Sequence, residues 1–225
     1  YNYHRVHAPA VLPRVVDAYR LLLPFDGDQH AYAAFTRRSA PPTGSGPSAV
    51  IRDLAARDDA VPAAMRGDLW QALQHAHVVA AGERYLRLMV LPGPQAWNVR
   101  ARHMAATIGR LLGRYGPGSR AVVWSHNTHI GDARATAMHL AGELNLVQLS
   151  RERYGESAVF AVGLATAGGS VLAARRWDGP RQRMTVPPPR PDSLESALLA
   201  AGPGDRLLLF ETDSPAGGLL QRWLP

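Results

Sequence analysis

The chain has 225 residues, enough to bury one large core or two small ones, and its 46% hydrophobic and 19% charged residues are typical of a globular protein. It contains no cysteine, which excludes disulfides, thiolate nucleophiles and cysteine–zinc sites and agrees with a cytoplasmic location. The formal net charge is +7, but all 25 basic residues are arginines spread along the chain, so we predict no nucleic-acid partner. No apolar run reaches the roughly 18 residues of a membrane span, so we predict no membrane partner either.

Residues 1–95 are predicted to be mainly helical. Apolar residues recur at helical spacing, and Pro24 and the Pro-Gly-Pro sequence at 92–94 interrupt two of the helical patterns. Residues 39–48, SAPPTGSGPS, form the clearest loop, and Ser48 is a candidate N-cap for the helix that follows. The helical patterns cover residues 9–23, 48–54 and 66–91.

Residues 96–225 are predicted to carry a sheet. After an amphipathic helix at 95–116 that Gly116 closes, short β-branched and apolar runs indicate buried strands. Helical segments lie between them, and a strand, a crossover and a second strand make a β-α-β unit. We therefore predict an α/β fold, a mainly parallel sheet with flanking helices, in a single domain over 1–225. The expected strands are 120–125, 157–166, 169–177 and 205–210, and the expected later helices are 135–155 and 192–202.

Polar side chains gather directly after the first expected strand, in the sequence VVWSHNTHIGDAR at 122–134. Catalytic groups of parallel sheets lie beyond the carboxyl ends of the strands, so His126 and His129 are candidates for a site there. Three interpretations compete. The two imidazoles could bind a metal, move a proton or polarise a carbonyl, or only hydrogen-bond the backbone of their loop. The spacing alone does not decide between them, since helical metal pairs usually sit four residues apart.

Several segments resemble the erythromycin esterase family. They are AGERYLRLM, WNVRARHMAATIGRLL, AVVWSHNTHIGDARAT, GELNLVQLSRERYG and WDGP, and DAYRLLLPFDGDQHAY is similar to the family's middle section. The His-Asn-x-His loop after an apolar strand is the most specific element. The resemblance implies helices around a mainly parallel sheet without a serine triad, and hydrolysis of a macrolide-like lactone by activated water, an activity that gives antibiotic resistance.

The resemblance also implies roles for individual residues. Its active site contains both histidines of the loop, which assigns His126 and His129 to catalysis, and Arg100 occupies the position of the family's arginine after Trp-Asn. The neighbouring Asn127, Asp132 and Arg134 are assigned to substrate binding, and the partner is a small-molecule ester or lactone. No cofactor is expected: a divalent metal would find no full ligand set among these residues, and the oligomeric state is open.

Two departures from the family pattern lead to a further expectation. Family members are longer, and nothing in residues 1–60 matches their N-terminal Gly-Glu-x-x-His-like motif. We therefore expect a partial member, a fragment that holds about half of the active site and has weak or no activity by itself. The alternative is a non-catalytic module that uses the same strand-end rim to hold a ligand or to assemble with a partner.

Overall fold

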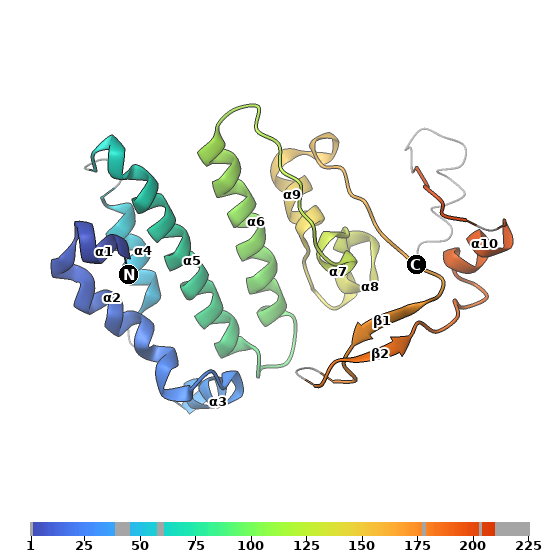
Figure 1. Cartoon of the computed structure of the whole chain (residues 1–225), viewed down its shortest axis with the longest axis horizontal. Coiled ribbons are helices and arrows are strands. Elements are labelled where there is room, and N and C mark those ends of the chain that lie inside the picture. Colours follow the sequence, from blue (N-terminus) through green and yellow to red (C-terminus); the bar gives the residue numbers. More distant parts are fainter. Residues whose placement is uncertain (1, 39–45, 58–60, 177–178, 203, 210–225) are drawn as a thin grey trace. The chain divides into compact units, whose positions relative to one another are not determined.

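A computed structural model describes residues 2–38, 46–57, 61–176, 179–202 and 204–209. The chain divides into two compact units, Tyr1–Phe160 and Ala161–Pro225, and each is described here by itself. The first unit is helical and carries every candidate site residue. Figure 1 shows the path of the chain through both units.

The first unit is a series of α-helices joined by short 3-10 turns (Figure 1). Its α-helices are α1 (Asn2–His7), α2 (Leu12–Tyr19), α3 (Gln29–Arg38), α4 (Pro47–Ala55), α5 (Arg66–Leu88), α6 (Gln95–Tyr115), α7 (Asn127–Ile130), α8 (Ala137–Leu140) and α9 (Leu146–Tyr154). The 3-10 turns are η1 (Pro9–Val11), η2 (Arg20–Phe25), η4 (Ala63–Met65), η5 (Ala133–Ala135) and η6 (Glu156–Ala158).

Helices α5 and α6 form a long antiparallel pair at the centre of this unit (Figure 1). The turn between them contains Pro92 and Pro94, and α6 starts at the residue after Pro94. The helix ends at Gly116, whose φ of 86° lies in the left-handed region that glycine adopts without steric cost. The sequence predicted both helices, and the structure confirms them to within three residues at each end.

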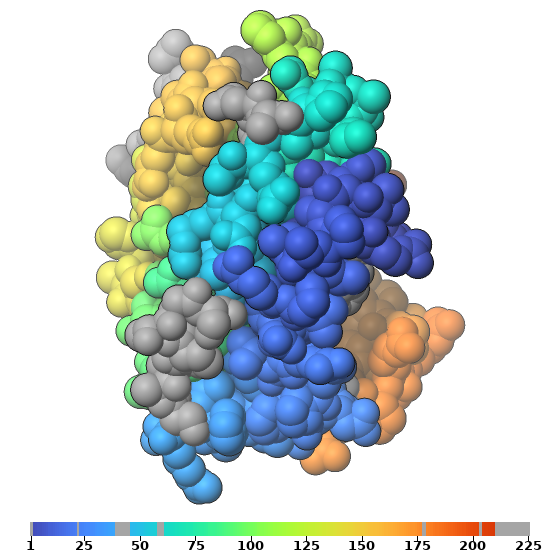
Figure 2. All heavy atoms as spheres, turned by 90° about the vertical axis from the view of Figure 1, so that its left-hand side faces the viewer, coloured from blue at the N-terminus to red at the C-terminus, as the bar shows by residue number. Residues whose placement is uncertain are grey.

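The buried core of the first unit lies between α1, α2, α4 and α5. Its largest fully buried side chains are those of Leu54, which is 0% exposed, and Leu69, which is 2% exposed. Figure 2 looks onto this side of the molecule, where the dark blue side chains of α1 and α2 meet the cyan side chains of α4. The remaining core residues are Tyr3, Val15, Ala18, Val50 and Ala76.

The second unit contains a β-hairpin and a short helix. Strands β1 (Ser170–Ala173) and β2 (Gln182–Thr185) pair antiparallel, with Ser170 opposite Thr185. Helix α10 (Leu194–Ala200) begins after Ser193, whose hydroxyl accepts the backbone N–H of Ser196 at 3.3 Å. The sequence offers Asp192 or Ser193 as the cap of this helix, and the structure shows Ser193 in that role.

The predicted α/β fold with a mainly parallel sheet is wrong for the described residues. They are mainly helical, and the sheet found among them is the two-stranded antiparallel hairpin β1–β2. Among the described residues, the expected strands 120–125 and 157–166 pair with no other strand. The same holds for residues 205–209 of the expected strand 205–210, whose residue 210 is not described. Of the expected strand 169–177, residues 170–173 form β1, and residue 177 is not described.

The side chains explain how the pattern misled. The apolar run at 120–125 indicated a buried strand, yet Val122 is 95% and Trp124 is 88% exposed, and Phe160 in the second run is 84% exposed. Periodicity reports what a segment could bury, whereas a strand also needs a neighbour for its N–H and C=O groups. No such neighbour stands beside these segments within the described ranges.

Smaller corrections concern the helices. Helix α4 begins one residue before Ser48, which therefore lies inside it, and Gly46 is its N-cap. Pro24 does not follow a helix directly but lies within η2. The expected helix 135–155 is divided into η5, α8 and α9, and most of the predicted loop 39–48 lies outside the described residues. None of the described helices has the length and apolar character that crossing a membrane requires.

Candidate functional site

The His-Asn-x-His loop folds into one helical turn, α7. His126 is its N-cap: Nδ1 accepts the backbone N–H of Thr128 at 3.3 Å and lies 3.0 Å from the Thr128 hydroxyl oxygen. An N-cap imidazole stabilises the start of the turn by meeting an N–H group that the helix itself leaves free. His126 is exposed, so its Nε2 edge is open to solvent or to a ligand.

His129 lies on the other side of the same turn, against helix α6. Its ring stacks on Trp97 with a centroid distance of 4.6 Å and an angle of 4° between the planes. The Nδ1 atom of His129 is buried and has no hydrogen-bond partner among the described residues. A buried polar atom without a partner is costly, so this nitrogen is a candidate for contact with a ligand or a water.

Arg100 brings a positive charge to the same place. Its guanidinium carbon lies 5.6 Å from the centroid of the Tyr85 ring and 5.7 Å from that of Trp97. Burial, the nearby Arg100 charge and His126 together lower the pKa of His129 from its ordinary value. His129 is therefore held in its neutral form at physiological pH, beside a permanent cation.

Trp97 and Asn98 fix this arrangement from the first turn of α6. The indole N–H of Trp97 donates to the Leu144 carbonyl at 2.7 Å. The Asn98 amide donates to the Gly142 carbonyl at 2.9 Å and accepts the Leu144 N–H at 2.8 Å. Nothing in the local sequence pattern shows that Trp97 and Asn98 contact a turn far along the chain.

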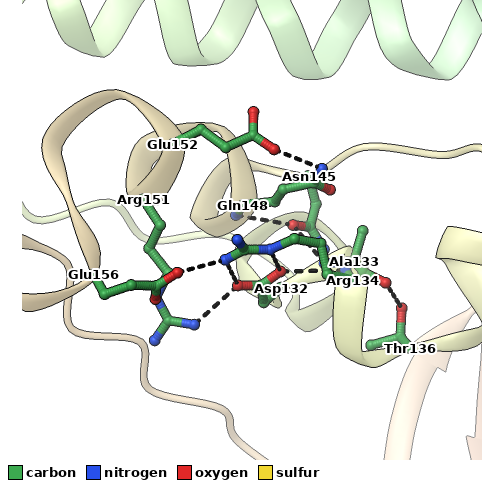
Figure 3. Close-up of polar contacts among 9 residues, drawn as sticks. All are labelled: Asp132, Ala133, Arg134, Thr136, Asn145, Gln148, Arg151, Glu152 and Glu156. Carbon is green, nitrogen blue, oxygen red and sulfur yellow. Dashed lines mark hydrogen bonds and ion pairs between the residues drawn. The ribbon is translucent and has the colours of Figure 1, made fainter.

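Asp132 and Arg134, in the segment that follows α7, belong to a network of opposite charges (Figure 3). Arg134 donates to both Asp132 carboxylate oxygens, at 2.9 and 2.6 Å, and Arg151 donates to Asp132 at 2.9 Å. Glu156 pairs with both arginines. The hydrogen bonds from Arg134, followed by those from Arg151, lower the pKa of Asp132 to about 2 against the opposing effect of burial.

Asn145 links this network to helix α9. It is 1% exposed, and its side-chain oxygen accepts the N–H groups of Ala133, at 3.0 Å, and of Gln148, at 3.4 Å (Figure 3). It thus caps α9 and holds the chain segment that follows Asp132 at the same time. The loop that carries both histidines therefore contacts α6 through the stack of His129 on Trp97, and Asn145 joins its end at Ala133 to α9.

Comparison with known protein families decides the affiliation of the chain. The model of the family described as "Erythromycin esterase" matches residues 1–225. The chain belongs to the erythromycin esterase family. This confirms the resemblance found in the sequence, and family membership indicates a hydrolase-type function. No solved structure matches the chain.

The site residues expected of an erythromycin esterase fall into two groups. His129 and Arg100 lie together on Trp97, and His126 flanks them on the exposed side of α7. Asp132 and Arg134 form an ion pair with each other, so each neutralises the charge of the other. Their predicted part in substrate binding, like that of the exposed Asn127, stays a prediction. Within the described ranges, no three His, Asp or Glu side chains come together as a metal site.

Proposed function

We propose that this member of the erythromycin esterase family hydrolyses a macrolide-like lactone, with His129 and Arg100 at the reacting centre and His126 beside them. We expect the activity to be weak, because residues 1–60 contain no match to the N-terminal motif of the family. One observation carries the proposal: a neutral, partly buried imidazole with an unpartnered nitrogen lies beside a guanidinium that no described carboxylate neutralises. A proton acceptor next to a fixed positive charge is the pair of groups that ester hydrolysis needs.

The histidines carry out the proton transfers. Neutral His129 accepts a proton from a water molecule as the water oxygen forms a bond to the lactone carbonyl carbon. The imidazolium then returns the proton to the ring oxygen as the carbon–oxygen ester bond breaks. This leaves a carboxylic acid and an alcohol in one opened chain, and the acid then loses its proton to the solvent. His126, on the exposed side of the same turn, would orient the carbonyl or relay the proton.

Arg100 stabilises the negative charge that develops on the carbonyl oxygen. A guanidinium donates several hydrogen bonds and keeps its charge at every working pH. The rings of Tyr85 and Trp97 hold it near His129, so little reorganisation is needed when the oxyanion forms. Burial, followed by the same charge, lowers the pKa of His129, which preserves its ability to accept a proton.

The test follows erythromycin incubated with the chain by mass spectrometry, where ring opening adds the mass of one water. We expect His129→Asn and Arg100→Gln each to lower the rate by about 100-fold or more. The matched control is His30→Asn: His30 is exposed on α3, so this change should leave the rate as in the wild type.

Three outcomes contradict the proposal in different ways. Wild-type rates in both the His129 and Arg100 variants would remove these residues from the reaction. Binding of erythromycin, measured by calorimetry, without any ring opening would instead support the alternative of a ligand-binding module. A lack of both binding and hydrolysis would exclude the macrolide as the substrate.

A further inference from the structure

A groove between helices α6 and α9 lies within the first unit, apart from the histidine loop. It has a volume of about 240 Å³, and the apolar part of its lining consists of Ala105, Ala106 and Leu149. Arg102 and Arg153 line it as well, together with Ser150 and Tyr154. We call this the α6–α9 groove. Its lining combines a small apolar part with two cationic groups and two hydroxyl groups.

The sequence of α6 builds the groove from small residues on one helix face. Positions 102, 105, 106 and 109 follow the spacing i, i+3, i+4, i+7 and so lie on the same side of the helix. A Cβ added at Gly109 would lie 2.6 Å from Nη1 of Arg153. The absence of a side chain at Gly109 therefore leaves the space in which the Arg153 guanidinium lies against α6.

The cationic groups of the groove have no acidic neighbour in its lining. The Arg153 guanidinium carbon lies 5.3 Å from the centroid of the Tyr154 ring, a cation–π contact that leaves its charge in place. The nearest acidic residue in sequence, Glu152, instead accepts a hydrogen bond from Gln148 at 2.9 Å. Arg102 is exposed and forms no ion pair with any residue that the structure describes.

We propose that the α6–α9 groove binds a small organic carboxylate, an alkyl or aryl acid whose apolar body contacts Ala105 and Ala106 of its lining. Guanidinium groups bind carboxylates through paired hydrogen bonds, and Ser150 and Tyr154 add hydroxyl donors. Ligand pockets usually have volumes of about 300–1,000 Å³, so a groove of about 240 Å³, which lies below this range, admits only a small ion. Arg102 and Arg100 lie about 200° apart around α6, so this site is separate from the reacting centre and does not depend on the proposed function.

The experiment titrates the whole chain with 4-phenylbutanoate and, separately, with the uncharged 4-phenylbutanamide. Isothermal calorimetry measures the affinity, and amide NMR shifts locate the binding. We expect the carboxylate to bind at millimolar concentration or below and to shift amides that line the groove, while the amide probe binds at least about tenfold more weakly. Arg102→Gln and Arg153→Gln should each weaken binding of the carboxylate by about fivefold or more, since each removes a charge-assisted contact.

Two further variants separate the site from general charge effects. Arg84→Gln removes one charge from the exposed side of α5 and should leave the affinity unchanged. Gly109→Ala keeps both arginines but displaces the Arg153 guanidinium, so it should weaken binding. Equal affinity for the two probes would overturn the proposal, as would an equal loss in Arg84→Gln, shifts confined to the histidine loop, or no detectable binding of the carboxylate at 10 mM.

Discussion

Asn145 offers the sharpest test of how the histidine loop is held. Its side-chain oxygen accepts two backbone N–H groups, one from Ala133 in the loop and one from Gln148 in the first turn of α9. Ala133 is fully buried, and Asn145 itself is 1% exposed. The variant Asn145→Ala removes the acceptor without adding bulk, so both N–H groups lose their partner where water has little access.

The expected loss combines two contributions and one offset. Removing an asparagine N-cap costs about 1 kcal/mol. Leaving the buried Ala133 N–H without an acceptor costs about 1–3 kcal/mol more. The Asn145 amide nitrogen is itself buried without a partner in the described structure, and its removal offsets part of this cost. We expect the free energy of unfolding to fall by about 2 kcal/mol, which lowers Tm by roughly 4–8 °C for a chain of this size.

The measurement is urea unfolding followed by circular dichroism, with Thr136→Ala as the matched control. Thr136 also caps a helix, since its hydroxyl accepts the Met138 N–H at 3.2 Å, but it is exposed. Thr136→Ala should therefore cost about 1 kcal/mol or less. If Asn145→Ala destabilised the protein no more than Thr136→Ala does, the buried bond to Ala133 would not hold the loop, and the reasoning would fail.

Three further predictions concern pH and exposure. Burial, followed by neighbouring positive charges, lowers the pKa of His77 and His103 at the α5–α6 interface. The stability that these two histidines contribute is therefore present above pH 6.5 and lost as the pH falls. Changing both to Gln should flatten this part of the plot of urea midpoint against pH. Arg100→Gln removes a charge that lowers the pKa of His129, so the acid limb of the pH–rate profile should move to higher pH, and an unmoved limb would separate the two groups. Trp124 is 88% exposed, so Trp124→Ser should change the free energy of unfolding by less than about 0.5 kcal/mol, and a loss above about 2 kcal/mol would show that the ring is buried.

Local chemistry in the sequence was enough to predict the helices that carry the site. Helices α5 and α6 and their ends followed from apolar spacing, from the prolines between them and from Gly116, all of which act within a few residues. The cap at Ser193 was visible for the same reason. The family followed from short motifs, and the match over the whole chain confirmed it.

The arrangement of the candidate site was only partly within reach of the sequence. Motifs were enough to name His126, His129 and Arg100. That His129 and Arg100 both contact Trp97, while His126 is an exposed helix cap, is visible only in the structure. Likewise, nothing near Asp132 in the sequence shows that its charge is met by Arg151 as well as by Arg134. These contacts join segments far apart in the chain, and a local pattern carries no record of them.

The tertiary structure alone decided what becomes of the apolar runs. The spacing of residues 120–125 is that of a buried strand, but burial and pairing require a neighbour that the run itself does not specify. Among the described residues, the run belongs to no helix or sheet, and Val122 and Trp124 are exposed. A helix closes its hydrogen bonds within its own sequence, whereas a strand closes them with another segment, so the helices could be predicted locally and the sheet could not.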